Sequence, residues 1–180
     1  MALPSIDDVI AFWFEDDKRW WKKDPAFDAE IREHFGALHQ AIEADEREDW
    51  LQTARGALAY VIVLDQFSRN MFRDTGRMFA SDARALRAAK NAIDAGHDQA
   101  LSKSERGFLY MPLMHSEALA DQERCIELFA ANDSPNSVKF AQMHRDIVQR
   151  FGRFPHRNAL LGRESTDEER EFLQQPGSSF

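Results

Sequence analysis

Two histidines, four arginines, an aspartate and an asparagine lie within residues 144–158, HRDIVQRFGRFPHRN, around a single glycine. A helix that ends at a glycine needs no more than one cation near its last carbonyl groups. The additional polar groups therefore predict a place where hydrogen-bonding and titratable side chains are held against the core. The residue types alone do not define which ligand or reaction they serve.

His156 is the best single candidate in this segment for acid–base chemistry or ligand contact, because an imidazole titrates near neutral pH. Arg153 and Arg157 could together bind a carboxylate or a phosphate. With Asn158 and with His144, which faces inward on the preceding helix, they form a first candidate ligand-binding set. The alternative is a loop whose arginines only bind backbone carbonyls at helix ends.

A second candidate set lies in residues 54–71, where the spacing of apolar residues predicts a helix. Asp65 and Arg69 are one turn apart on a face that is otherwise apolar, and Asn70 follows directly. The alternative is an intrahelical ion pair, which would contribute only ~0.3–0.5 kcal/mol if exposed. Buried charges need further partners, because desolvation costs several kcal/mol. We therefore expect all three side chains in a polar cluster that faces another helix or a pocket.

The third set follows Pro112, a proline inside a helical pattern. Proline removes a backbone hydrogen bond and opens space one turn before His115. His115 and Glu117, together with His156, are the candidate catalytic residues, and Tyr110 is a further candidate ligand contact. The alternative is that His115 is an ordinary core histidine, which is the commoner role of a single histidine on an apolar stripe.

Several kinds of chemistry are excluded by the motifs that are missing. The sequence has no glycine-rich phosphate loop, no Cys-x-x-Cys pair and no serine nucleophile elbow. His115, Glu117, His144 and His156 match no known spacing of metal ligands, so we predict no metal and no cofactor. Cys125 stands among apolar residues and is expected in the core.

Charge and hydropathy limit the class of partner. The net charge is −8, whereas nucleic-acid binding needs a broad basic surface, so no nucleic-acid partner is expected. Residues 139–163 are the exception, with six cations against one acid (+6 − 1 = +5), which favours a small anionic molecule or a peptide terminus. The alternative is that these arginines pair with the protein's own acids. The longest apolar run has eight residues, 57–64, so no membrane partner is expected.

The single cysteine and the acidic start of the chain, which does not resemble a secretion signal, predict a cytoplasmic protein. The sequence makes no prediction of the oligomeric state.

Helix signals recur along the whole chain, and strand signals are nearly absent. Capping boxes begin at Ser5, Ser102 and Thr166, and Asp24-Pro25 and Ser134-Pro135 are typical helix starts. A turn is expected at 73–76. The expected helices lie after Ser5 and over about 25–44, 54–71, 81–96, 102–131 (kinked at the proline), 135–152 and 167–175.

These elements predict a single all-α domain, 1–180, of seven or eight antiparallel helices joined by short loops, with residues 175–180 as a mobile tail. Paired helices of 12–18 residues favour a tetratricopeptide-like array. No period of about 34 residues is visible, so any helical repeat is degenerate.

Several motifs together resemble a family of bacterial proteins, the domain of unknown function number nine hundred and twenty-four. The motifs are FWF, LDQFSRN, FASDA, ERGFLYMPLMHSEALADQER, HRDIVQRFGRFPHRN and LGRESTDEE, which span nearly the whole chain. The resemblance implies an all-α, tetratricopeptide-like fold and no established activity, so it assigns no catalytic residue. The family has proline where this chain has Ser68, so a proline kink there plays no part in this chain.

Three functions follow from these sets as alternatives. The first is a binding protein that holds a small anionic ligand or a peptide terminus in a pocket lined by LDQFSRN, the Pro112 region and RFPHRN. The second is a small cofactor-independent enzyme, a hydrolase or lyase, in which His156 or His115 works with a carboxylate. The third is a structural scaffold with no small-molecule site. The first two require the three candidate sets to converge in space.

Overall fold

The computed structural model describes residues 2–179, and these fold entirely into helices and connecting turns. This confirms the all-α class. The main helices are α1 (Ile6–Phe14), α2 (Pro25–Glu43), α3 (Ala54–Val61), α4 (Ser68–Met71), α5 (Asp82–Asp94), α6 (Lys103–Met114), α7 (Leu119–Ala131), α8 (Pro135–Phe151) and α9 (Asp167–Phe172).

Most helix starts are those that the sequence predicts. Ser5, Ser102 and Thr166 each cap a helix through a complete capping box, and the Asp24 carboxylate accepts from the first backbone N–H groups of α2. Ser81 precedes α5 but does not cap it through its side chain; its hydroxyl donates to a Glu43 carboxylate oxygen at 3.1 Å. Local hydrogen bonding thus fixes most helix starts in this chain.

The expected kinked helix over 102–131 is wrong in one respect, since the structure has two helices with a break between them. The first, α6, ends at Met114, two residues after Pro112, and α7 begins at Leu119. The buried Gln122 amide donates to the carbonyls of Met114 and Ser116, at 2.6 Å each. These bonds satisfy carbonyls that a continuous helix would have paired, so the break is stable.

The expected helix over 54–71 is continuous but not uniform. Between α3 and α4 the chain forms a π-helical segment, η3 (Ile62–Phe67), and all six of its residues are buried. A π turn spaces its backbone hydrogen bonds five residues apart instead of four, which alters the direction of the side chains that follow. Asp65 lies inside this segment and Arg69 just after it.

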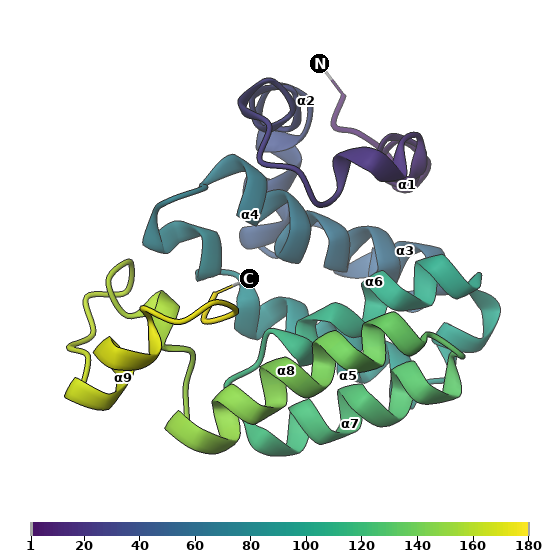
Figure 1. The fold of residues 1–180 in the computed structure, drawn as a ribbon. Helices are drawn as coiled ribbons and strands as arrows, with labels where there is room; N and C mark the ends of the chain where they lie inside the picture. The colour runs from purple at the N-terminus through teal and green to yellow at the C-terminus, as the bar shows by residue number, and fades with distance from the viewer. Residues whose placement is uncertain (1, 180) are drawn as a thin grey trace.

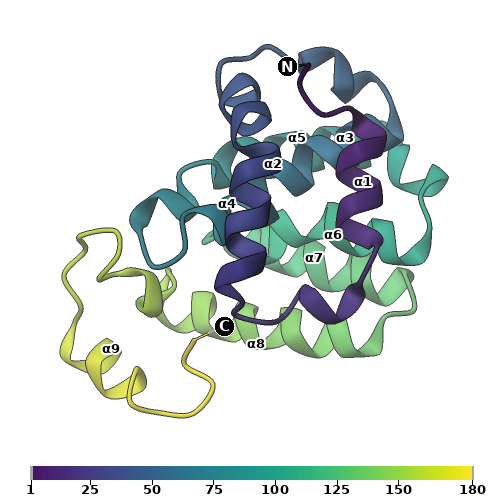
Figure 2. The same cartoon turned by 90° about the horizontal axis from the view of Figure 1, so that it is seen from above.

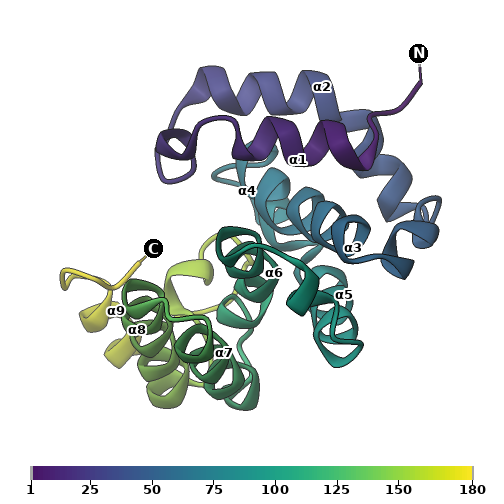
Figure 3. The same cartoon turned by 90° about the vertical axis from the view of Figure 1, so that its right-hand side faces the viewer.

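The helices are arranged in layers around the segment 54–71 (Figure 1). Helices α1 and α2 form a pair that covers one side of it, as the views from above and from the side show (Figures 2 and 3). On the other side α5, α6, α7 and α8 follow one another, with α7 packed between its two neighbours (Figure 3). The core between the layers contains an aromatic cluster, with edge and stacked contacts among Trp13, Trp20, Phe27, Phe67 and Phe108.

After α8 the chain turns at Gly152, whose φ of +70° suits a glycine. The following segment contains the short helix η6 (Pro155–Arg157), and Phe154 packs with Ile147 and Val148 in a small second core. Figure 1 shows this segment returning toward the end of α4 and the start of α5 before the chain reaches α9. Residues far apart in sequence are thereby brought together.

The remaining expectations about organisation have mixed outcomes. The Ser178 side chain is buried and its hydroxyl donates to the Leu173 carbonyl, while residue 180 lies outside the described residues, so mobility of the tail stays a prediction. The tetratricopeptide-like arrangement also stays a prediction. Within residues 2–179, each helix is too short or too polar to cross a membrane.

Gly56 and Gly36 offer a test of how tightly α3 is packed. A Cβ atom at Gly56 would lie 2.1 Å from the Trp50 carbonyl oxygen, whereas one at Gly36, inside α2, meets nothing within 4 Å. We expect Gly56→Ala to lower the free energy of unfolding by about 1–3 kcal/mol through overpacking. Gly36→Ala should raise it by about 0.5–1 kcal/mol, since alanine favours helix. Urea denaturation of both variants checks this, and equal stabilities would contradict it.

Candidate functional site

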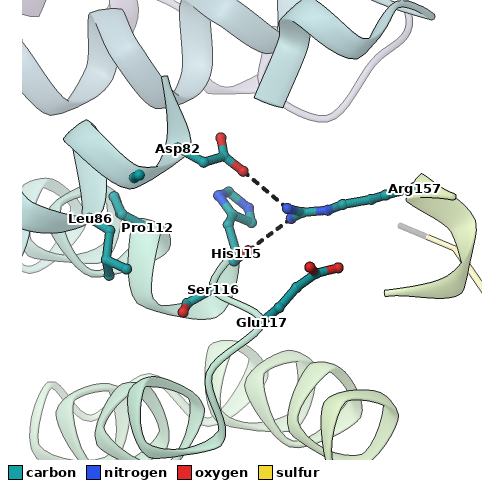
Figure 4. Close-up of a pocket in the computed structure, with 8 residues that line it drawn as sticks. Asp82, Leu86, Pro112, His115, Ser116, Glu117 and Arg157 are labelled. Carbon is teal, nitrogen blue, oxygen red and sulfur yellow. Dashed lines mark hydrogen bonds and ion pairs between the residues drawn. The ribbon is translucent and has the colours of Figure 1, made fainter. Parts of the chain in front are cut away.

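The structure brings parts of all three candidate sets together at one place. Asp65, which is bonded to Arg69, lies against His115 at the end of α6. Arg157 in η6 donates to the backbone carbonyl of the same histidine (Figure 4). Four segments that are distant in sequence meet here, because the start of α5 also contributes Asp82. We call these five residues and Glu117 the polar cluster.

Asp65 is the most deeply buried member of the polar cluster, with none of its surface exposed. One of its oxygens, Oδ1, lies 2.7 Å from His115 Nδ1 and 3.1 Å from Arg69 Nη1, and the other accepts from Gln66 Nε2 at 2.6 Å. Burial alone would raise the pKa of this carboxyl, but the charge of Arg69 and the His115 hydrogen bond hold it well below the usual range. The carboxylate is therefore ionised.

The ionised carboxylate decides which nitrogen of His115 carries the proton. Because Asp65 can only accept, we assign the proton to Nδ1, which leaves a lone pair on Nε2. Burial and the neighbouring Arg69 charge lower the pKa of His115, so the ring is neutral near pH 7. Nε2 has no hydrogen-bond partner among the described residues. An imidazole oriented by a carboxylate in this way is equipped to accept a proton.

Asp82 links the two arginines of the polar cluster, and the sequence did not single it out. Arg69 donates to both of its oxygens, at 3.0 and 3.1 Å, and Arg157 Nη1 donates to Oδ2 at 3.1 Å. Acids are common in the first turn of a helix, where the helix dipole favours them, so its position in α5 is unremarkable. Its place in the FASDA motif was the available signal.

Arg157 spans the cluster from the side of η6. Its second terminal nitrogen, Nη2, donates to the His115 backbone carbonyl at 2.9 Å, and its guanidinium lies over the rings of Phe79 and Phe154. Burial lowers its pKa, although the side chain keeps its charge. Arg157 therefore fixes the end of α6 relative to α5.

Glu117 is held as an anion by the segment that follows α8. It accepts from Arg163 through two hydrogen bonds, at 2.7 and 2.9 Å, and from the Phe154 backbone N–H at 2.7 Å. Burial opposes ionisation, but these donors lower the pKa of the carboxyl below its usual value. Glu117 does not contact His115 in any of these bonds, so the carboxylate that orients His115 is Asp65.

A cavity of about 220 Å³ opens beside the polar cluster. In Figure 4 the imidazole of His115 lies beside the ion pair of Asp82 and Arg157. The Ser116 hydroxyl donates to Asp121, so it is engaged elsewhere. The lining residues are Asp82, Ala83, Leu86, Pro112, His115, Ser116, Glu117 and Arg157.

Of the predicted ligand contacts, only His115 and Arg157 are among the residues that line this cavity, and four of the others bind groups outside the polar cluster. The Tyr110 hydroxyl donates to Asp98 at 2.7 Å, where burial raises its pKa, and Asn70 donates to Asp28 at 2.8 Å. Both side chains thus bind carboxylates of other elements, since Asp98 lies in the short helix before α6 and Asp28 lies in α2.

Arg153 and Asn158 are the other two, and both bind Glu169 of α9. Arg153 makes two bonds to its oxygens, at 2.7 and 2.8 Å, and Asn158 donates to Oε2 at 3.2 Å. The Arg153 hydrogen bonds, with further donors from the Thr166 backbone and Asn158, lower the pKa of Glu169 to about 2. These donors hold α9 in place, and a ligand-binding role for the two residues stays a prediction.

The basic character of residues 139–163 is offset by the protein's own acids. In addition to the arginines already described, Arg145 pairs with Asp146 and Arg150 with Glu168, each at 2.8 Å. This is the alternative that the sequence left open for the arginines, and it reduces the excess positive charge from which an anionic ligand was expected.

Comparison with known proteins agrees with this fold. Residues 9–177 match the family described as "Bacterial protein of unknown function (DUF924)". The chain belongs to this family. The solved structure of ATU0120, a protein of unknown function from Agrobacterium tumefaciens, has 43% sequence identity and a TM-score of 0.90, and the match covers 94% of this chain and 96% of that chain. No curated protein matches the chain.

Two further histidines of this DUF924 protein lie next to the polar cluster. The His144 ring centroid is 6.5 Å from that of His115, and Phe154 packs against both His144 and His156. Burial lowers the pKa of His144 to about 3, despite a hydrogen bond from its Nδ1 to the Phe140 carbonyl, and lowers the pKa of His156 to about 4. Within residues 2–179, no group of three or more His, Cys, Asp or Glu side chains is arranged to hold a metal ion.

These histidines predict how stability depends on pH. A histidine in the unfolded chain has a pKa of about 6.5, so below that pH the unfolded state binds more protons than the folded state. The free energy of unfolding should therefore be highest above about pH 6.5 and fall as the pH approaches 4. Urea denaturation between pH 8 and pH 4 measures the free energy of unfolding at each pH. Its slope against pH reports the difference in the number of protons bound by the unfolded and folded states.

His144→Asn should flatten that slope, because asparagine can still donate to the Phe140 carbonyl but does not titrate. The exposed His34 on α2 provides the control, since His34→Gln should leave the slope unchanged. An identical slope in the wild type and in His144→Asn would show that burial of this ring is not the cause.

Proposed function

We propose that this protein is a small cofactor-independent enzyme in which His115 acts as a general base, oriented by Asp65. The observation that carries the proposal is the 2.7 Å contact between Asp65 and His115 Nδ1, with the same imidazole forming part of a cavity wall. A binding site needs only shape and complementary groups. A buried carboxylate that orients a neutral imidazole is the arrangement used for proton transfer.

The cavity supports a reaction in which a proton is removed from a small substrate or from water. His115 Nε2 accepts the proton, and the ionised Asp65 stabilises the resulting imidazolium. Arg157, which also lines the cavity, is the cation nearest to negative charge that develops on the substrate. With the Ser116 hydroxyl bonded to Asp121, the described residues that line the cavity offer no free hydroxyl or thiol nucleophile to His115. Base-activated water (a hydrolase) or removal of a substrate proton (a lyase) is therefore the reaction class.

Binding without catalysis, as the basic segment led us to expect, has weaker support. Such a protein would need unpaired cations to attract a small anion or a peptide terminus. Arg157 and Arg163, however, are paired with Asp82 and Glu117. In this proposal Arg157 instead contacts a polar oxygen of the substrate. A purely structural role is the third alternative, and it does not explain why His115 lines a cavity.

The proposed location of the protein is the cytoplasm. The buried Cys125, which forms no disulfide, supports this location.

The decisive variants are His115→Asn and Asp65→Asn. Asparagine at 115 keeps a donor for Asp65 but has no basic nitrogen, so it separates structure from chemistry. The screen uses p-nitrophenyl esters and phosphates for hydrolysis and β-hydroxy carboxylates for elimination. Loss of a general base should reduce kcat by about 10²–10⁴-fold for any substrate that is turned over.

The pH profile gives a second reading of the same residue. Since the pKa of His115 is lowered from 6.5, the rate should be constant above that pH and decline below it as the ring protonates. His34→Gln, which changes an exposed histidine that does not line the cavity, should keep the wild-type rate. Full activity in a folded His115→Asn variant would refute the proposal, as would no turnover of any compound by the wild type.

A further inference from the structure

A second cavity of about 290 Å³ adjoins the first along α5. The two share Ala83 and Leu86 as wall residues. The residues of the second follow positions i, i+3, i+4, i+7, i+8 and i+11, which is one continuous stripe of a helix. They are Ala83, Leu86, Arg87, Lys90, Asn91 and Asp94. A molecule bound at His115 can therefore extend along this stripe of α5.

The charges in the second cavity differ in how they are paired. Lys90 donates to Asp121 at 2.7 Å, and Asp94 accepts from Arg124 at 2.5 Å. Arg87 is exposed and has no hydrogen-bond or ion-pair partner among the described residues. The guanidinium of Arg87 is thus available to a ligand, with the Lys90 ammonium one helical turn farther along the same stripe.

The first cavity has the opposite balance. It is lined by two carboxylates, Asp82 and Glu117, and by one cation, Arg157, which is already paired with Asp82. Negative charge on a ligand is therefore better placed near Arg87 than near His115. From residue 82 to residue 90 the helix rises by roughly 12 Å, which is the length of a small extended metabolite.

We propose that Arg87 binds an anionic group, a carboxylate or a phosphate, at the end of an elongated substrate whose other end reacts at His115. This inference rests on the proposed function and adds to it the class of substrate. Arg87 would be a specificity-determining residue, because its guanidinium can form two parallel hydrogen bonds to either anion. Lys90 adds a second positive charge beside it.

Titration with small anions tests the site without any need for turnover. Inorganic phosphate and acetate are added at constant ionic strength, with chloride as reference, while the backbone amide signals are followed by NMR. We expect saturable shifts over residues 83–94 for at least one of the two anions, and the stronger response identifies phosphate or carboxylate as the preferred group. In Arg87→Gln the apparent affinity should fall at least fivefold.

Two variants control this experiment. Arg170→Gln removes an exposed arginine on α9 and should leave the response of α5 unchanged, while His115→Asn should also leave it unchanged. Shifts that do not saturate, or that are equal in Arg87→Gln and the wild type, would overturn the inference. That result would leave the proposed function intact, because the general-base test depends on His115 and not on Arg87.

Discussion

The burial of the Asp65 carboxylate is the constraint on which the site depends. A charge with no exposed surface must be compensated by donors, since its desolvation costs several kcal/mol. Here the donors are His115, Arg69 and Gln66, and Arg69 extends the set to Asp82. Gln66 and Arg69 lie close to Asp65 in sequence, whereas His115 and Asp82 come from distant parts of the chain. Satisfying one carboxylate therefore fixes the end of α6 and the start of α5 relative to α3.

The π-helical segment η3 contains Asp65 and sets the local backbone geometry around the buried carboxylate. In a regular α-helix the Asp65 carbonyl would pair four residues on, whereas a π turn spaces these bonds by five. In this structure the Asp65 carbonyl oxygen accepts from Arg69 Nη1 at 2.8 Å, and the same nitrogen reaches Oδ1. One guanidinium thus supports both the backbone and the carboxylate at the widened turn. The irregular helix and the buried charge stabilise each other.

Features set by neighbours in sequence were predictable, and those set by distant partners were not. Capping at Ser5, Ser102 and Thr166 and the glycine end of α8 depend on residues within a few positions, so the sequence predicts these boundaries correctly. The break after Met114 depends on Gln122, eight residues away. In the site, His115 and Asp65 could be named as candidates, but their pairing spans 50 residues. The FASDA motif includes Asp82 but does not show its arginine partners. Most arginines of 139–163 could not be paired from the sequence, because their carboxylate partners lie in other segments.

A structural clamp explains only part of the polar cluster. The Asp82–Arg157 and Glu117–Arg163 pairs tie the segment after α8 to α5 and α6, and that role needs no titratable ring. Buried ion clusters add little net stability compared with apolar packing of the same volume, so stability alone is a weak reason to keep one. His115 is the member of the polar cluster that a purely structural role explains least well. An asparagine would also donate to Asp65, whereas the second nitrogen of the imidazole binds nothing within the described residues and the ring lines a cavity. The presence of an imidazole at this position is therefore explained by chemistry with a molecule in that cavity.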